Sequence, residues 1–457
     1  MSTTASKSKN DTLSYAAALG LVGPLIVTVT LNKPPFWAMS VGTAVAFLCA
    51  AIRLRQVRPA ASFALGGLSR VVNVVILIAL VSLMTAVWFS SGTIQGLMYY
   101  GLKIVKPRYV AFSGLALSTV LSTLIGSSLG TVATVGVAIM GIAGAFGVPL
   151  APVAGAIMSG AIFGDRVSFL SPIYHLTVDL TGSDAHKATK RILASGWPAL
   201  AACAVISIAL GLSMDPGEVS KGLAWSAEFL ADLQQTSLIS AWVLLPTALV
   251  VVLAVRKVPV RTCLAAATVT AGAIAVLYQG ESVEGVLRTA FFGYSAQNAT
   301  PQVAALLRNG GLRGTVNLLL LLVFAGMYTG IMESSGMMDD VSRGLVSHLR
   351  TRRSFLVGAM GVSILSAALG SNQAMAVIIP ARAMDSKRRE LGVSPEDFAG
   401  AMSDSGVPAA GIIPWNIMAV MCSAALQVPP LAFAPYTVIA FALPLAGLWL
   451  MRKPGGS

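Results

Sequence analysis

Charged side chains are scarce in this sequence. Only 11% of the 457 residues are Asp, Glu, Lys or Arg, whereas 56% are hydrophobic. Soluble domains carry about 25% charged residues, so a soluble chain of this composition could not cover its core with polar surface. The hydrophobic residues form runs of about 20, the length that crosses a bilayer as a helix. The sequence therefore predicts an integral membrane protein with many spans.

Cysteines are few and scattered. Cys49, Cys203, Cys263 and Cys422 lie far apart, in or beside apolar segments, with no C-x-x-C pair. This spacing argues against a disulfide framework and against a zinc site. The cysteines are expected to be buried as small hydrophobic residues.

Motifs of the common enzyme classes are also missing. No G-x-x-x-x-G-K-[ST] motif is present, which argues against an ATP-driven pump within this chain. Gly164-Asp165 lacks the first glycine of the G-x-G-D motif of intramembrane aspartyl proteases, and no Tyr precedes an Asp. A serine protease could use Ser127 or Ser128 together with His175, but neither serine lies in a G-x-S-G motif. The sequence therefore predicts that the protein is not an enzyme and has no cofactor.

The net charge of +13 comes from basic residues in short segments between apolar runs. This pattern is typical of positive-inside loops and not of nucleic-acid binding. The basic segments lie near residues 53–70, 256–261, 382–389 and 452–453, whereas 215–232 is acidic. We expect both termini and the basic loops on the cytoplasmic side of the cell (inner) membrane. The stretch 92–109 fits this scheme poorly because of Lys103, Lys106 and Arg108.

The apolar runs predict an all-α fold with about 10–12 transmembrane helices. The runs lie near 13–31, 36–52, 71–91, 110–125, 131–146, 149–163, 194–214, 236–255, 262–278, 314–332, 354–369, 373–380, 398–425 and 431–451. The expected organisation is a disordered cytoplasmic tail (1–12), a first transmembrane half (13–230), connecting helices (231–310) and a second half (311–457). The first run is expected to be a retained span because no small-residue cleavage site follows it.

An internal repeat indicates what the two halves do. Residues 121–127 and 365–371 both read L-S-x-x-x-G-S, and each is followed by a second polar break that contains an aspartate. Asp165 comes 39 residues after Gly126, and Asp404 comes 34 residues after Gly370. This common order is expected of two inverted repeats, each with a re-entrant or broken helix.

Helix breaks inside a bilayer free backbone groups and are costly unless they line a polar cavity or are buried in protein. The candidate breaks are Gly126, Ser127 and Ser128 in the first half and Ser371, Asn372 and Gln373 in the second. Their carbonyl and hydroxyl oxygens would suit Na⁺, and the half-helix N-termini could hold an anionic substrate. The alternative is that these small residues only allow close helix packing.

Asp165 and Asp404 are the strongest single candidates. A carboxylate at membrane depth costs about 2.5–3.5 kcal/mol on insertion scales, so its retention suggests a function. Each could exchange a proton for Na⁺, and this is the minimal chemistry of a cation/proton exchanger. The alternative is a position at a helix end in water, and Asp165 could also pair with the adjacent Arg166. His175, after the first-half break, could titrate near neutral pH, whereas Glu333 is expected at an interface.

These residues resemble the NhaC family of Na⁺/H⁺ antiporters, within the wider ion transporter superfamily. The resemblance runs from about residue 60 to the C-terminus and is strongest over 126–136, 153–165, 370–373, 378–380 and 412–416. It implies an inverted-repeat transporter with a scaffold part and a mobile part. Carried over by position, it places six residues in or beside the site: Asp165, Ser168, Ser171, Gln373, Asp404 and Asn416.

Two departures from the family pattern concern its acids. Pro172 stands where the family typically has an acid after the serine matched by Ser171, and Asn372 stands where it often has an acid before the glutamine. The loss of two carboxylates weakens a Na⁺ site and alters the number of charges exchanged. A small organic acid or an amino acid, coupled to Na⁺ or H⁺, is therefore an alternative cargo.

The sequence thus predicts a secondary active transporter, with Na⁺/H⁺ antiport by alternating access as the leading hypothesis. An ion channel is the alternative from another class, although a channel needs no pair of interrupted helices with central acids. The expected partners are the lipid bilayer and Na⁺ and H⁺ or a small solute. A homodimer is compatible with the sequence, but no patch of residues identifies a dimer face.

Overall fold

A computed structural model describes residues 2–31, 33–215, 224–227, 229–231, 233, 238–256, 258–295, 307, 309–346 and 349–451. Over these ranges the regular structure is helical, with one isolated antiparallel bridge between Tyr294 and Asn309. Nine of the described helices are long and apolar enough to cross a membrane, and eleven spans result if two bent helix pairs each count as one. The predicted all-α membrane fold is therefore confirmed. All four cysteines are buried and free.

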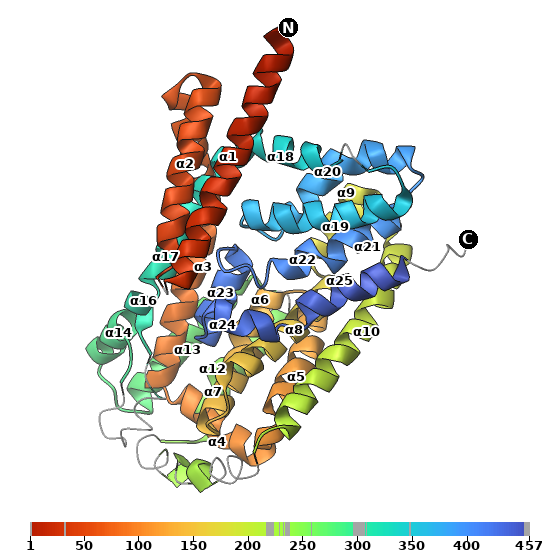
Figure 1. Cartoon of the computed structure of the whole chain (residues 1–457). Helices are drawn as coiled ribbons and strands as arrows, with labels where there is room; N and C mark the ends of the chain where they lie inside the picture. Colours follow the sequence, from red (N-terminus) through yellow and green to blue (C-terminus); the bar gives the residue numbers. More distant parts are fainter. Residues whose placement is uncertain are drawn as a thin grey trace.

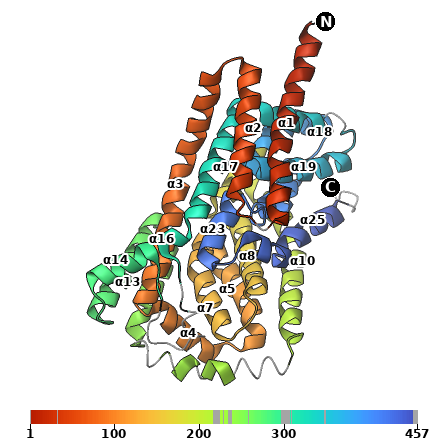
Figure 2. The ribbon, with the colours of Figure 1, turned by 60° about the vertical axis from the view of Figure 1, so that its left-hand side comes forward.

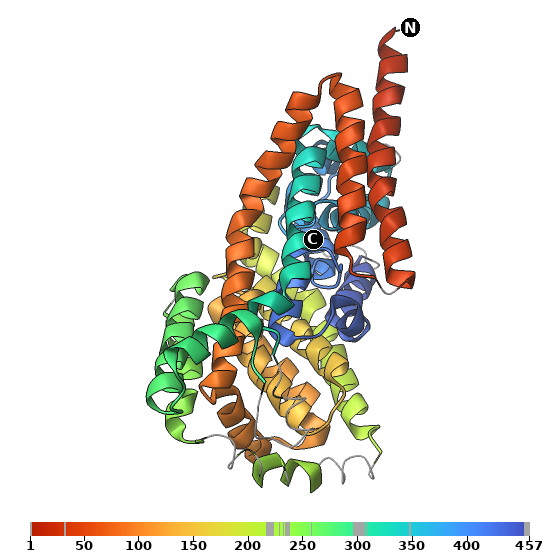
Figure 3. The ribbon, with the colours of Figure 1, turned by 90° about the vertical axis from the view of Figure 1, so that its left-hand side faces the viewer.

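One bundle combines helices from both ends of the chain. It contains α1 (Ser2–Thr30), α2 (Phe36–Leu54), α3 (Val57–Ser90), α17 (Val316–Ser334) and α18 (Met337–Val346). Figures 1, 2 and 3 show α1, α2, α17 and the first part of α3 side by side. Ion pairs join α2 to α18 (Arg53–Asp340) and α3 to α17 (Arg70–Glu333). Residues 2–12, where a disordered tail was expected, belong to α1.

A second group of helices lies at the other end of the molecule. It contains α4 (Thr93–Ile104), α5 (Val110–Ile125), α6 (Ser128–Thr131), α7 (Val137–Ala145), α8 (Leu150–Val167) and α10 (Ala185–Leu212). Helices α5 and α8 cross in backbone contact. A Cβ atom on Gly160 would lie 2.3 Å from the Leu115 carbonyl oxygen, and one on Gly164 would lie 2.5 Å from the Thr123 nitrogen. This crossing fixes the end of α8, where Asp165 lies.

The connecting segment contains η3 (Ala241–Leu244), α12 (Leu245–Val255), α13 (Val260–Leu277), α14 (Val283–Phe292) and α16 (Gly311–Gly314). In this segment, α13, α14 and α16 pack against α3, as the green helices beside it in Figure 3 show. Most acidic residues of the predicted 215–232 loop, Lys257 and the basic tail 452–453 lie outside the described residues.

The last part of the chain is made of short helices. These are α19 (Arg352–Leu369), α20 (Met375–Glu390), α21 (Pro395–Asp404), α22 (Gly406–Ala409), α23 (Ile417–Leu426), α24 (Pro430–Phe433), η4 (Ala434–Tyr436) and α25 (Ile439–Leu450). Helix α9 (Pro172–Thr181) packs against α20 and α21. The apolar run 398–425, which the sequence analysis treated as one segment, is thus divided among three helices.

The helix interruptions have local causes. Gly126 ends α5 with φ +72°, a left-handed conformation that glycine adopts without steric cost. Ser171 caps α9, and Pro172 occupies the first helical position. The axes of α8 and α9 differ by 47°, and those of α23 and the 430–436 segment by 91°. The interruptions at 126–127 and 370–374 lie where the repeat predicted them, whereas the inverted relation of the halves and their boundaries stay predictions.

The basic segments are divided between the two ends of the molecule. The turn between α2 and α3, which carries Arg55, lies at the same end as the N-terminus, and α4 with Lys103 lies at the opposite end (Figures 1 and 2). The stretch 92–109, predicted to fit the positive-inside scheme poorly, is thus remote from the first basic loop.

Candidate ion-binding site

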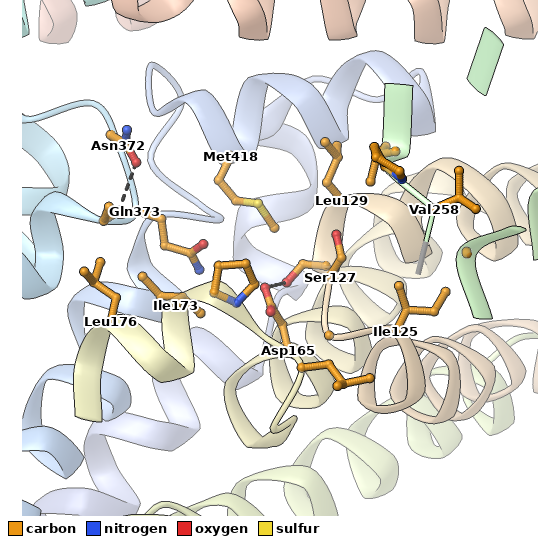
Figure 4. Close-up of a pocket in the computed structure, with 18 residues that line it drawn as sticks. Ile125, Ser127, Leu129, Asp165, Ile173, Leu176, Val258, Asn372, Gln373 and Met418 are labelled. Atoms are coloured by element: carbon orange, nitrogen blue, oxygen red, sulfur yellow. Dashed lines mark hydrogen bonds between the residues drawn. The ribbon is translucent and has the colours of Figure 1, made fainter. Parts of the chain in front are cut away.

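The helix interruptions meet around a cavity of about 540 Å³. Six of the predicted site residues line it: Gly126, Ser127, Ser128, Asp165, Asn372 and Gln373. Figure 4 shows Asp165 and Ser127 on one side of the cavity and Asn372 and Gln373 on the other, with Met418 between them. The structure therefore brings the two sequence repeats together at one site.

Asp165 is the only charged side chain among the described residues that line this cavity. It belongs to the last turn of α8 and is 7% exposed. Its Oδ2 accepts a hydrogen bond from the Ser128 hydroxyl at 2.6 Å (Figure 4). Its Oδ1 is buried and has no hydrogen-bond partner among the described residues. A buried carboxylate oxygen without a donor is costly, so this oxygen is suited to hold a proton or a cation.

The first-half interruption positions Ser128 toward that carboxylate. Because Gly126 turns the chain, α6 begins only three residues after α5 ends, and Ser127 caps it by accepting a hydrogen bond from the Gly130 nitrogen at 3.1 Å. A Cβ atom on Gly126 would lie 2.6 Å from the Leu170 carbonyl carbon. This position therefore requires glycine for its conformation and for the close approach of the 168–171 turn.

The second-half interruption supplies amide groups. The Asn372 Oδ1 accepts a hydrogen bond from the Ala374 nitrogen at 3.0 Å, and the Gln373 Nε2 donates to the Val407 carbonyl at 3.2 Å. The Gln373 oxygen is thus left for the cavity, toward which its amide extends in Figure 4. Between these residues and α19, Ser371 has φ +48° and a buried hydroxyl without a partner among the described residues.

Pro172 also lines the cavity, so both positions at which the sequence resemblance implies acids in the family lie at it. The other lining side chains are mainly apolar, among them Leu129, Ile173 and Met418.

Four predicted residues do not line the cavity and contact backbone groups, although the Ser171 side chain also interacts with Asp165. The hydroxyl oxygens of Ser168 and Ser171 accept hydrogen bonds from the Leu170 and Tyr174 nitrogens at 3.2 and 3.3 Å. His175 is exposed, and its Nε2 lies 2.8 Å from the Phe169 carbonyl oxygen. Asn416 is fully buried, caps α23 and donates from Nδ2 to the Ala367 carbonyl at 2.8 Å.

Asp404, the second predicted acid, lies in a different environment from Asp165. It is fully buried at the end of α21, and it does not line the cavity. Its Oδ1 accepts from the Arg166 Nη2 and from the Ser195 hydroxyl, both at 2.5 Å. Its Oδ2 lies 3.3 Å from the Arg191 Nη1. In this conformation both carboxylate oxygens are engaged by protein donors, which leaves Asp404 little capacity to bind a cation.

Arg166 therefore pairs with Asp404 and not with its neighbour Asp165. The guanidinium is 1% exposed and also lies 3.2 Å from the Ser403 hydroxyl. Sequence reasoning missed this role and also that of Arg191, whose side chain is 13% exposed and contacts both Asp404 and Asp397. A signal was present: Arg166 follows a strongly apolar run, where an uncompensated charge would be as costly as that of Asp165.

Several known antiporters are similar in sequence to this chain. The Na(+)/H(+) antiporter NhaC of Bacillus subtilis is 25% identical over 383 residues, 84% of this chain and 84% of that protein. The malate-2H(+)/Na(+)-lactate antiporter of the same organism is 26% identical and covers 82% of this chain and 80% of its own length. The arginine/ornithine antiporter ArcD of Halobacterium salinarum is 27% identical, with coverage of 81% and 76%.

A sequence profile of the Na⁺/H⁺ antiporter family matches residues 163–451, which include Asp165, Gln373 and Asp404. This range covers more than half of the chain, and it includes the end of α8 and the second-half interruption at 370–374. The chain therefore belongs to the Na⁺/H⁺ antiporter family.

Proposed function

We propose that this protein is a secondary active transporter of the cell membrane that exchanges Na⁺ for H⁺ by alternating access. The observation that carries the proposal is the Asp165 carboxylate, which is buried, faces the cavity and has one oxygen without a hydrogen-bond donor among the described residues. A proton and a cation compete for the same carboxylate oxygen. Binding of one therefore requires release of the other, and this competition is the basis of exchange.

Neutral oxygens of the cavity would complete the cation's coordination. Ser127 and Ser128 offer hydroxyl oxygens, and Gln373 and Asn372 offer amide oxygens. Oxygen ligands of this kind are used for coupling ions at interrupted helices of other transporters. Asp404 is outside this set in the proposal, because its oxygens are engaged by Arg166, Arg191 and Ser195.

We also propose that the end of the molecule that carries the N-terminus faces the cytoplasm. The turn between α2 and α3 at that end contains Arg55, and Arg53 and Arg58 lie in the adjoining helix ends. Arginine-rich short loops favour the cytoplasmic side during insertion.

The test uses everted membrane vesicles with a preformed pH gradient and a pH-sensitive dye. Addition of Na⁺ or Li⁺ should collapse the gradient in vesicles with the wild-type protein, and Asp165→Asn should abolish the response. Asp385→Asn is the matched control, because Asp385 is an acid of the surface end of α20 paired with Arg388 and Arg389. Normal exchange by Asp165→Asn would contradict the proposal. Sodium flux without proton movement would indicate a channel.

An organic cation is a second candidate cargo. A cavity of about 540 Å³ with many apolar side chains is larger than a single metal ion needs, and its one described charge is negative. Such a site favours a cargo with an ammonium or guanidinium group over a simple carboxylate. The nearby arginines, Arg166 and Arg191, are paired with Asp404, and neither of them lines the cavity.

The same vesicles distinguish the two cargoes. If arginine or ornithine dissipates the gradient and Na⁺ does not, the organic-cation candidate replaces Na⁺ exchange. If malate or lactate does so, the charge argument is wrong.

A further inference from the structure

A small second cavity lies on the other side of the 370–374 segment. Its volume is about 70 Å³, enough for one or two water molecules at about 30 Å³ each. It is enclosed by α3, α17 and the start of α23, and its polar lining comes from Arg70, Thr329, Glu333 and Asn372. Of the residues proposed above as Na⁺ ligands, Asn372 alone also lines this cavity.

Asn372 lines both cavities, so one thin segment of chain separates them. The segment has no helical structure over residues 370–374. Ser371 adopts a left-handed conformation, which a residue with a side chain adopts at a cost of about 1–2 kcal/mol. Its buried hydroxyl has no partner among the described residues. A strained segment with an unused hydroxyl is a suitable barrier between two cation positions.

A partly exposed charge pair lies beside this second cavity. Glu333 and Arg70 form an ion pair between α17 and α3, with side chains 25% and 58% exposed. The Thr329 hydroxyl donates to the Gly370 carbonyl at 3.0 Å, which ties the separating segment to the same helix as Glu333. Carboxylate, hydroxyl and amide oxygens thus line one small space together with the Arg70 guanidinium, and the Glu333 and Arg70 side chains beside it are partly exposed.

We propose that this cavity is an outer cation station, in which Glu333 holds the cation before it passes Asn372 to reach Asp165. Arg70 competes with the cation for the Glu333 carboxylate, and its exposed side chain can move into water when a cation binds. The proposal rests on the cation exchange proposed above and adds a second binding position and a path to it.

The test measures access to a cysteine at the shared wall in purified protein. Asn372→Cys is introduced in the wild-type background, where the four native cysteines are buried. Its modification rate is measured by mass spectrometry with cationic 2-aminoethyl methanethiosulfonate and with uncharged methyl methanethiosulfonate. The ratio of the two rates reports the local electrostatic attraction for cations and does not require transport.

Glu333→Gln should lower this ratio about tenfold, because a single charge in a confined site changes cation arrival by about this factor. Arg70→Gln should raise it. Asp340→Asn is the matched control, because this acid also pairs with an arginine across the bundle, Arg53, and lies outside the cavity. Na⁺ should slow the cationic reagent more than choline does at equal ionic strength, and Glu333→Gln should remove that difference.

Three results would overturn the proposal: an unchanged ratio in Glu333→Gln, an equal fall in Asp340→Asn, or a fall in Asp165→Asn alone. The last result would mean that cations reach Asn372 only through the central cavity. Absence of Na⁺/H⁺ exchange in vesicles would refute the function proposed above without affecting these rates.

Discussion

The buried pair of Arg166 and Asp404 allows a prediction that separates structural from transport roles. Both side chains are at most 1% exposed, and the Nη2–Oδ1 distance is 2.5 Å. Removal of one partner from such a pair leaves an uncompensated charge and costs about 3–5 kcal/mol. The loss of unfolding free energy in Asp404→Asn should fall within this range. The asparagine amide would remove the negative charge and would also direct a hydrogen-bond donor at the arginines.

Arg191→Gln should lower the free energy of unfolding by less than Asp404→Asn does. Its Nη1–Oδ2 contact with Asp404 is 3.3 Å, its side chain is 13% exposed, and Asp404 would keep Arg166. Loss of a hydrogen bond to a charged group costs about 1.5–3 kcal/mol. The structure therefore predicts a graded series, with Asp404→Asn and Arg166→Gln the most severe single changes.

The single variants Arg166→Met and Asp404→Leu and the double variant Arg166→Met/Asp404→Leu form a double-mutant cycle. Replacement of a buried ion pair by apolar residues of similar volume is often neutral or stabilising by about 1–4 kcal/mol. The double variant should therefore lose far less stability than the sum of the two single changes. The assay is unfolding of the purified protein in a mixed detergent series, followed by the fluorescence of its seven tryptophans.

Two outcomes would refute this reasoning. If the double variant loses the full sum, the two residues do not stabilise each other. If Asp404→Asn is as stable as the wild type but inactive in exchange, Asp404 acts as an ion ligand, as the sequence analysis expected.

Three smaller changes test other parts of the structure. Ser128→Ala should raise the Na⁺ concentration for half-maximal exchange about tenfold, since it removes a hydrogen bond to a charged group worth about 1.5–3 kcal/mol. Gly164→Ala should cost about 1–3 kcal/mol in unfolding experiments because its Cβ would meet backbone atoms of α5. Although burial opposes it, bonds from Arg388 and Arg389 hold the pKa of Asp385 below its usual value. The ionised Asp385 carboxylate should contribute less than about 1 kcal/mol to the free energy of unfolding. This contribution should be present above about pH 4 and lost as pH falls further. Asp385→Asn should therefore destabilise the protein more at pH 7 than at pH 3.

The sequence predicted the membrane class and the positions of the interruptions because both depend on local features. Runs of apolar residues determine the membrane spans. Gly126 and the 370–373 cluster interrupt the helices whatever the tertiary packing around them. The convergence of Asp165 with Asn372 and Gln373 followed from the repeat. Glu333, expected at an interface, forms an ion pair between two helices.

The pairing of charges depended on tertiary contacts that a single sequence does not reveal. Asp404 and Asp165 have the same sequence context, an acid near small residues in an apolar run, yet only Asp165 faces the cavity. The difference arises because Arg166 and Arg191 reach Asp404 from α8 and α10, more than 200 residues away. His175 was a reasonable candidate by type, but it lies on the exposed face of α9.

The adjacency of Asp165 and Arg166 gives the last turn of α8 two functions. Consecutive residues of a helix point about 100° apart, so the carboxylate faces the cavity while the guanidinium reaches α21. A change of occupancy at Asp165 that shifts this turn must also shift Arg166, whose geometry with Asp404 is tightly constrained. Asp404 in turn lies next to Ser405, where the chain breaks between α21 and α22. One helical turn thus joins the proposed cation site to an interruption in the second half of the chain, and this link gives binding a physical route to a conformational change.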